Sequence, residues 1–211
     1  MRHLLRHQWI ELFLVSVLLS GCATAPKFDS GKSQGTWKTE IQFKDKMKDK
    51  SQSFSSVVFA EKNWPLRMEI TGTLGVSVAS LLIEENQIHG LLHLKKQSLI
   101  GENSQSGIKP VIGFEIPPEI LLSAFFDEPI SDKNWTCRQD ANGKVEECLR
   151  LKDKFRIAWA DRDEERKRVI LETDRFEAQI LVKDFQPKVQ NRDRVFKLSI
   201  PSSYKQYKVR P

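Results

Sequence analysis

Long apolar runs, histidine and cysteine are scarce in this sequence, and each scarcity narrows what the protein can be. The longest mainly apolar run, residues 9–19, is too short for a membrane-spanning helix, which requires about 20 apolar residues. The sequence has four histidines and three cysteines, which leaves few ligands for a transition metal. Two of the histidines, His89 and His93, would lie about 13 Å apart on a strand, too far to chelate one ion. No glycine-rich loop stands before a helix to cradle a phosphate. We therefore expect no metal, no cofactor and no enzymatic activity.

The chain carries a moderate positive net charge. The formal net charge is +6 at neutral pH, and the basic residues are spread along the sequence without an interleaved aromatic motif. Such a surplus favours anionic surfaces without specifying a partner. We expect no nucleic-acid partner.

The first 22 residues have the pattern of an export signal. Arg2 and Arg6 precede the apolar run, and Leu19-Ser20-Gly21 precedes Cys22. A charged start, a short apolar segment and small residues at the end describe a cleaved signal peptide. The order Leu-Ser-Gly-Cys resembles the lipobox of bacterial lipoproteins, which implies a lipidated Cys22 after removal of residues 1–21. The small, polar stretch that follows predicts a flexible tether over residues 22–36 and an ordered domain over 37–211.

The two remaining cysteines suit an oxidising compartment, in which an even number favours a disulfide. Asn142-Gly143 between them is a strong hairpin signal, because a type I′ turn needs positive φ at both central residues. With a two-residue turn, Cys137 faces Cys148 at a hydrogen-bonded position, with Cα atoms about 5.5 Å apart. We expect a structural disulfide; a zinc site is the alternative, but no further ligand lies nearby.

Alternating apolar residues indicate many strands. In residues 37–47, Trp37, Ile41, Phe43 and Met47 share the odd positions, as in a strand with one buried face. Similar stretches occur at residues 53–61, 66–71, 76–84, 88–94, 135–140, 145–151, 155–161, 169–173, 176–185 and 195–201. Short turns between such stretches predict a mainly β protein with one large curved antiparallel sheet of about ten or eleven strands.

One segment breaks the alternation. Pro117 and Pro118 suit a helix start, and Pro129 ends it. Ile120, Leu121, Ala124 and Phe125 would share one face, so a short amphipathic helix is predicted to lie on the apolar side of the sheet. One to three such helices would form a lid, and the interior is either an apolar hollow or a fully packed core.

Two stretches resemble the LolA/LolB group of lipoprotein carriers, most closely the outer-membrane receptor LolB. The first is residues 67–75, RMEITGTLG, followed by a strand; the second is residues 113–118, GFEIPP, with its helix and Asp127-Glu128-Pro129. The resemblance covers residues 35–200 loosely and implies a half-open β-barrel closed by helices. Four features depart from the family pattern. Residues 27–36 predict no helix before the first strand, and residues 101–114 contain Gly107, Pro110 and Gly113, which discourage a long helix. Asp127 replaces a glycine, and the Cys137–Cys148 hairpin is additional.

The resemblance implies an apolar interior that takes acyl chains and an exposed leucine that helps to insert cargo into the membrane. Leu74, between two glycines in a turn, matches that leucine; the alternative is a leucine folded back onto its own strands. The candidate lining residues of the cavity are Phe43, Phe59, Met68, Ile70, Val78, Leu82, Leu92, Ile120, Phe125 and Trp159.

Two functions follow as hypotheses. The first is a monomeric lipoprotein anchored in the outer membrane and facing the periplasm. It would bind acyl chains or lipoproteins, delivered by a periplasmic carrier protein, and insert them as LolB does. The second is a docking or assembly subunit of the cell envelope with the same sheet and a filled interior.

Overall fold

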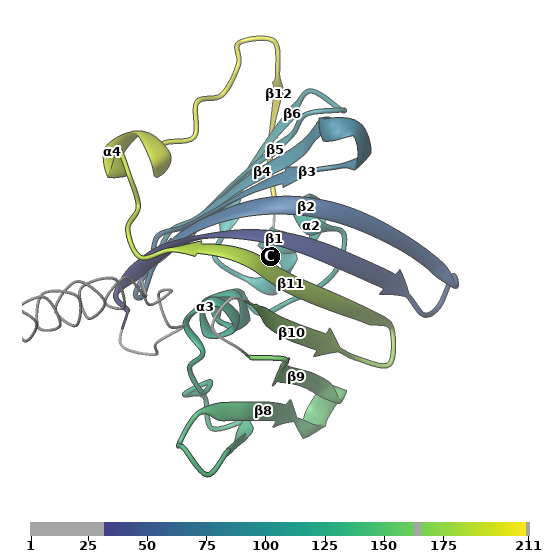
Figure 1. The fold of residues 1–211 in the computed structure, drawn as a ribbon. Helices are drawn as coiled ribbons and strands as arrows, with labels where there is room; N and C mark the ends of the chain where they lie inside the picture. The colour runs from purple at the N-terminus through teal and green to yellow at the C-terminus, as the bar shows by residue number, and fades with distance from the viewer. Residues whose placement is uncertain (1–31, 163–165, 210–211) are drawn as a thin grey trace, which may run out of the picture.

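One large sheet, antiparallel except for the pairing of its last strand, dominates the computed structural model, which describes residues 32–162 and 166–209. Within these residues the sheet has 12 strands in the order β12-β6-β5-β4-β3-β2-β1-β11-β10-β9-β8-β7. It curves into an open half-barrel (Figure 1). The prediction of a mainly β fold with a curved sheet is confirmed, with slightly more strands than expected. The predicted signal peptide, residues 1–21, and the predicted lipidation site Cys22 lie outside the described residues.

The strands have the following bounds. The first half of the sheet consists of β1 (Gln34–Asp45), β2 (Lys50–Glu61), β3 (Leu66–Thr71), β4 (Ser77–Ile83), β5 (Gln87–Leu92) and β6 (Gln97–Glu102). The second half consists of β7 (Thr136–Gln139), β8 (Val145–Arg150), β9 (Phe155–Ala160), β10 (Lys167–Glu172), β11 (Phe176–Gln186) and β12 (Lys205–Lys208). Strand β1 thus begins three residues before the expected boundary at Trp37.

Period-two alternation produces the buried inner face. Strands β3 and β10 alternate strictly between buried and half-buried residues, as expected for a sheet with one face on the core. The inner positions of neighbouring strands meet in register, for example Met68 with Leu81 and Val58. A continuous apolar layer results, against which the helices pack.

Two helices lie on this inner face. Helix α2 spans Gln105–Ile112 and helix α3 spans Pro118–Phe126. Both bury their apolar residues, including Ile108, Ile120 and Phe125. Helix α3 lies where the prolines predicted a helix, but it is buried on nearly all sides, Ser123 and Phe126 included, and is therefore not amphipathic as expected. Helix α2 is short and contains Pro110. Within the described residues, no helix is long and apolar enough to cross a bilayer.

The C-terminal segment differs from the expectation. The predicted strand at residues 195–201 is wrong: helix α4 occupies Arg192–Val195, and the chain then crosses to the far edge of the sheet. There β12 pairs in parallel with β6, which itself had not been predicted. The alternation at 195–201 indicates an extended chain equally well, and it does not specify a pairing partner.

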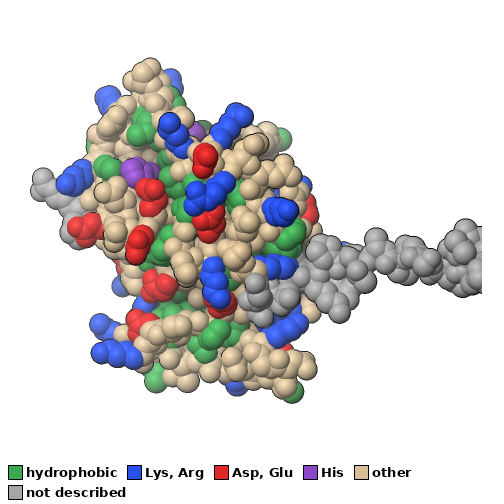
Figure 2. All heavy atoms as spheres, turned by 90° about the vertical axis from the view of Figure 1, so that its left-hand side faces the viewer, with side chains coloured by type: hydrophobic (Ala, Val, Ile, Leu, Met, Phe, Trp, Pro, Cys, Tyr) green, Lys and Arg blue, Asp and Glu red, His purple; other side chains and the backbone are tan. Residues whose placement is uncertain are grey.

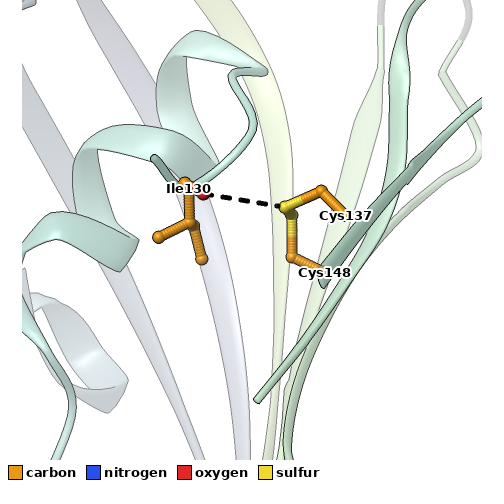
Figure 3. The surroundings of a disulfide bond; sticks show 3 residues. All are labelled: Ile130, Cys137 and Cys148. Carbon is orange, nitrogen blue, oxygen red and sulfur yellow. Dashed lines mark hydrogen bonds between the residues drawn. A yellow bond between two sulfur atoms is a disulfide. The ribbon is translucent and has the colours of Figure 1, made fainter. Parts of the chain in front are cut away.

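The expected Cys137–Cys148 disulfide is present between β7 and β8 (Figure 3). The turn between the two cysteines is not the predicted type I′, because only Gly143 has positive φ. Asp140 closes a longer loop by accepting a hydrogen bond from the amide of Lys144. A register shift between Arg138 and Gln139 compensates for the longer loop, so Cys137 still faces Cys148. Their Cα atoms are 4.0 Å apart, closer to the spacing of a non-hydrogen-bonded pair than to the expected 5.5 Å.

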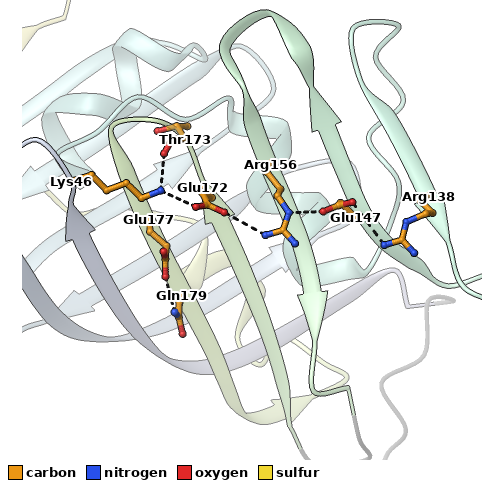
Figure 4. A network of polar contacts seen from close by, with 8 residues as sticks. All are labelled: Lys46, Arg138, Glu147, Arg156, Glu172, Thr173, Glu177 and Gln179. Atoms are coloured by element: carbon orange, nitrogen blue, oxygen red, sulfur yellow. Dashed lines mark hydrogen bonds and ion pairs between the residues drawn. The ribbon is translucent and has the colours of Figure 1, made fainter.

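A ladder of ion pairs crosses the outer face of the sheet over β8, β9 and β10 (Figure 4). Lys46, on the β1–β2 turn, donates to Glu172 at 2.8 Å, and Arg156 bridges Glu172 to Glu147. The hydrogen bond from Lys46, together with the charge of Arg156, holds the pKa of Glu172 below its usual range. The ladder ties β8, β9 and β10 to the end of β1.

Candidate functional site: an apolar cavity behind an aromatic gate

A small apolar cavity lies between the sheet and the helices. Its volume is about 90 Å³, and its walls are almost entirely apolar. The lining residues from the sheet are Ile41, Phe43, Phe54, Met68, Ile70, Val78, Ala79, Leu171, Ala178 and Ile180; those from the helical side are Val111, Ile112, Phe114, Ile116 and Leu121. The sheet thus forms the floor and the helices form the roof.

A cluster of three phenylalanines closes one end of this cavity. The ring of Phe114, in the α2–α3 connection, stacks on Phe43 with centroids 4.8 Å apart and lies 4.6 Å from the ring of Phe176. Beyond these rings lies an open groove of about 620 Å³ that also contacts Phe43 and Phe114. The groove has a mixed lining that includes Lys48, Lys109, Arg150 and Arg175. Phe43 and Phe114 therefore stand between a groove of mixed lining and an apolar cavity, and we name this pair the aromatic gate.

Helix α2 forms the roof next to this gate. Its first turn is capped by Ser104, whose hydroxyl accepts a hydrogen bond from the amide of Gly107 at 3.2 Å. Its last turn ends at Gly113, which has a φ of 90°, a left-handed conformation that glycine adopts without strain. Val111 packs on Gly90 of β5, where a Cβ atom would come within 2.4 Å of its methyl group. A glycine at this strand position is what lets the helix lie so close to the sheet.

Helix α3 is held to the sheet by a buried lysine. The ammonium group of Lys167, on β10, is completely buried and donates to the carbonyl oxygens of Ala124 and Phe125 at 3.0 and 2.9 Å. A positive charge at a helix C-terminus is favourable, because the last carbonyl groups have no partner within the helix. Lys167 thus joins α3 to the sheet.

The predicted lining residues divide into three groups. Phe43, Met68, Ile70 and Val78 line the cavity. Leu92, Ile120, Phe125 and Trp159 belong to or pack against the surrounding core without lining it. Phe59 and Leu82 make up the third group; they were predicted to line the cavity, and they do not.

Phe59 and Leu82 lie on the outer side of the sheet. Phe59 contacts a separate outer groove, because Val58 and Ala60 are the inward positions of β2. Leu82 pairs with Arg67, whereas the inward Leu81 pairs with Met68. The register shifts between Ile70 and Thr71, so Val78 and Ala79 both reach the cavity and the alternation after them is reversed. One extra residue in a strand has this effect, and alternation alone does not reveal it.

Leu74 is completely exposed. It lies in the short 3₁₀ turn η1, Thr73–Gly75, between β3 and β4, with a φ of 63°. It is therefore not folded back onto its own strands. A fully exposed leucine with a left-handed backbone is unfavourable in water and in conformation, so nothing in the fold of this turn favours leucine there.

A second, polar hollow lies on the outer face under the C-terminal segment. Ser80 binds Glu69 and also His93, whose other ring nitrogen lies 2.9 Å from the hydroxyl of Tyr204. The histidine binds a tyrosine rather than a carboxylate, so this chain of hydrogen bonds lacks the arrangement of a Ser-His-Asp triad. Its contacts hold the C-terminal segment on the sheet.

Three features were not predicted from the sequence: the G-x-S-x-G spacing at residues 31–35, the gate residue Phe114 and the buried Lys167. Residues 31–35, GKSQG, match the spacing of a nucleophile elbow, which the sequence reasoning overlooked. The match lacks the required strand–turn–helix context, because β1 begins at Gln34. The reasoning also missed the gate residue Phe114 and the buried Lys167. Phe114 follows directly after Gly113 in the recognised GFEIPP stretch, which was the available clue.

Comparisons with known proteins support the fold. No family model matches the sequence, and no curated protein matches it either. Among solved structures, the chain is similar to a LolA superfamily protein from Nitrosomonas europaea, with a TM-score of 0.55 and 10% identity over 79% of this chain and 91% of that one. A domain from Vibrio parahaemolyticus assigned to outer-membrane lipoprotein sorting gives a TM-score of 0.49 and 12% identity over 81% and 94%. The first of these similarities shows a LolA-like fold, a half-open β-barrel with helices over its inner face.

Proposed function

We propose that this protein is a non-enzymatic envelope lipoprotein that binds acyl chains of lipids or lipoproteins in the cavity beneath α2 and α3. The observation that supports this most is an apolar cavity joined by an aromatic gate to an open groove. Burial of an acyl chain in such a site is favourable by roughly 25 cal/mol per Å² of apolar surface. No covalent chemistry is needed.

The cavity volume implies a closed state. Pockets for small organic ligands usually measure about 300–1,000 Å³, whereas this cavity has about 90 Å³. An acyl chain therefore enters only if part of the roof moves. Lys167 holds α3 to the sheet, so α2 and the connection that contains Phe114 are the parts expected to move.

The membrane attachment rests on Cys22. We propose that residues 1–21 are removed and that Cys22 is lipidated, with residues 22–36 as tether and 37–211 as a LolB-like domain. Two or more acyl chains give stable anchoring. Ala23 follows the anchor instead of the aspartate that retains many lipoproteins at the inner membrane, which favours the outer membrane on its periplasmic side. A periplasmic carrier would deliver the cargo, and the exposed Leu74 would assist its insertion.

Uptake of a fluorescent fatty acid by the purified domain tests the binding function. Ala178 lines the cavity, so Ala178→Leu fills it with apolar atoms. The same change at Ala158, which pairs with Ile170 and Glu147 away from the cavity, is the matched control. We expect saturable binding in wild type and Ala158→Leu, and at least tenfold weaker binding in Ala178→Leu. Absence of binding in all three folded proteins would favour a docking or assembly subunit of the envelope instead.

A further inference from the structure

Three separate turns of the sheet share an unusual composition. Met47 stands between Lys46 and Lys48, Leu94 precedes Lys95 and Lys96, and Leu151 precedes Lys152. The three apolar side chains are exposed by 76%, 70% and 75%, respectively. An exposed apolar residue next to lysines occurs once in each turn, although the turns lie far apart in the sequence.

Strand pairing places these turns at one end of the sheet. Asp45, at the end of β1, pairs with Lys50 of β2 and with Phe176 of β11. Leu92 at the end of β5 pairs with Gln97 at the start of β6, and Arg150 pairs with Phe155 where β8 passes into β9. In Figure 1 the turns all lie on the right-hand side, together with the turn that contains Leu74, whereas β1 begins on the left.

The charge at this end is mainly positive. The basic residues in its turns or directly beside them are Lys46, Lys48, Lys50, Lys95, Lys96, Arg150, Lys152, Lys154, Arg175 and Lys205; the acidic ones are Asp45, Asp49, Asp153, Glu172 and Asp174. Some lysines pair with these carboxylates, as Lys154 does with Asp174 at 3.1 Å, but exposed pairs of this kind hold each other weakly. The opposite end, which faces the viewer in Figure 2, carries basic and acidic side chains intermixed.

We propose that this end of the sheet is a docking surface for an anionic phospholipid bilayer, formed by Met47, Leu94 and Leu151 together with the neighbouring lysines. The combination fits the chemistry of such a bilayer: lysines attract the anionic head groups, and isolated apolar side chains enter the boundary with the acyl region. Leu74 would then be one of several apolar side chains on this surface. Docking itself does not require the cavity to bind lipid, but its use in lipid transfer rests on the proposed function.

The groove outside the gate opens at this same end. Met47, Lys48, Arg150 and Asp174 contribute to its lining. Contact between these turns and a bilayer would place the groove, and behind it Phe43 and Phe114, next to the lipid. An acyl chain that leaves the cavity would then pass toward the membrane rather than into water.

Vesicle co-sedimentation tests the docking surface. All described strands, helices and core residues lie within residues 32–209, so a protein that starts at Ala23 retains the domain and lacks the lipid anchor. It should bind vesicles that contain phosphatidylglycerol, bind phosphatidylcholine vesicles much less, and dissociate at high salt. Replacing Lys95, Lys96 and Lys152 with glutamine should weaken binding about fivefold for each lysine lost. Lys144→Gln, on the hairpin at the opposite end, is the matched control.

The apolar contribution is tested by labelling. A polarity-sensitive dye on Leu94→Cys or Leu151→Cys should shift toward an apolar environment when anionic vesicles are added, whereas the dye on Ile200→Cys, in the C-terminal segment, should not. Equal binding to neutral vesicles, or no loss in the lysine variants, would overturn the proposal. Binding that depends on Leu74 alone would also overturn it. Fatty-acid uptake measured without vesicles shows separately whether the cavity functions.

Discussion

Lys167 Nζ lies 3.0 Å from Asp127 Oδ1, with the lysine side chain completely buried and the aspartate nearly so. Asp127 ends helix α3 with a left-handed φ of 56°, at the position where the LolB pattern that the sequence resembles has glycine. The aspartate therefore accepts an unfavourable backbone conformation and gives the buried ammonium a counter-charge.

The first prediction concerns this pair. Lys167→Met removes one partner and leaves the carboxylate of Asp127 and two helix carbonyls without their donor. Removal of one member of a buried pair costs about 3–5 kcal/mol, which urea unfolding measures. The additional change Asp127→Gly suits the positive φ and should restore part of the loss. A loss below about 1 kcal/mol would show that the pair contributes no more than a surface pair.

The same pair predicts a dependence on pH. Burial lowers the pKa of Lys167, and Asp127 opposes this only in part. Between the lowered pKa and the ordinary lysine value of about 10.4, the unfolded chain binds more protons than the folded protein. The contribution of Lys167 to the free energy of unfolding therefore rises with pH. The difference in unfolding free energy between wild type and Lys167→Met should therefore grow as the pH rises through this range. A constant difference would contradict the account.

The disulfide should stabilise its hairpin without affecting the cavity. The two cysteines are 11 residues apart, and closure of so short a loop contributes at most about 3 kcal/mol. Cys137→Ser with Cys148→Ser should lower the melting temperature but leave fatty-acid affinity unchanged, since β7 and β8 are the last strands at one edge of the sheet. A tenfold loss of affinity would show that this edge supports the cavity.

The aromatic gate should control the rate of ligand entry. Phe114→Ala removes the ring that stacks on Phe43 and Phe176, a loss of about 0.5–1.5 kcal/mol for each aromatic pair. Stopped-flow measurements should show faster uptake and faster release of a fluorescent fatty acid. Phe196→Ala, whose ring contacts Arg192 in the C-terminal segment, should behave as wild type. Unchanged rates in Phe114→Ala would mean that the ligand enters elsewhere.

The fold was predictable where a repeating pattern specifies it. Alternation of large apolar residues identified β3, β9 and β11, and the prolines on both sides of α3 delimited that helix. Alternation failed at Val78, because the bulge there reverses the inward positions and moves Leu82 to the outer face. The cavity depends on such register shifts and on the contact between Gly90 and Val111, which are tertiary relationships. Lys167 was unpredictable for a similar reason, since a lone lysine in a strand is usually exposed.

Native mass spectrometry of residues 23–211, purified from a periplasm under gentle conditions, shows whether the cavity holds an acyl chain. Wild type and Ala158→Leu should carry a bound lipid or acylated peptide, and Ala178→Leu should be empty while folded to the same extent by circular dichroism. Wild-type protein that is always empty, or Ala178→Leu that retains the same bound mass, would contradict acyl-chain binding in this cavity.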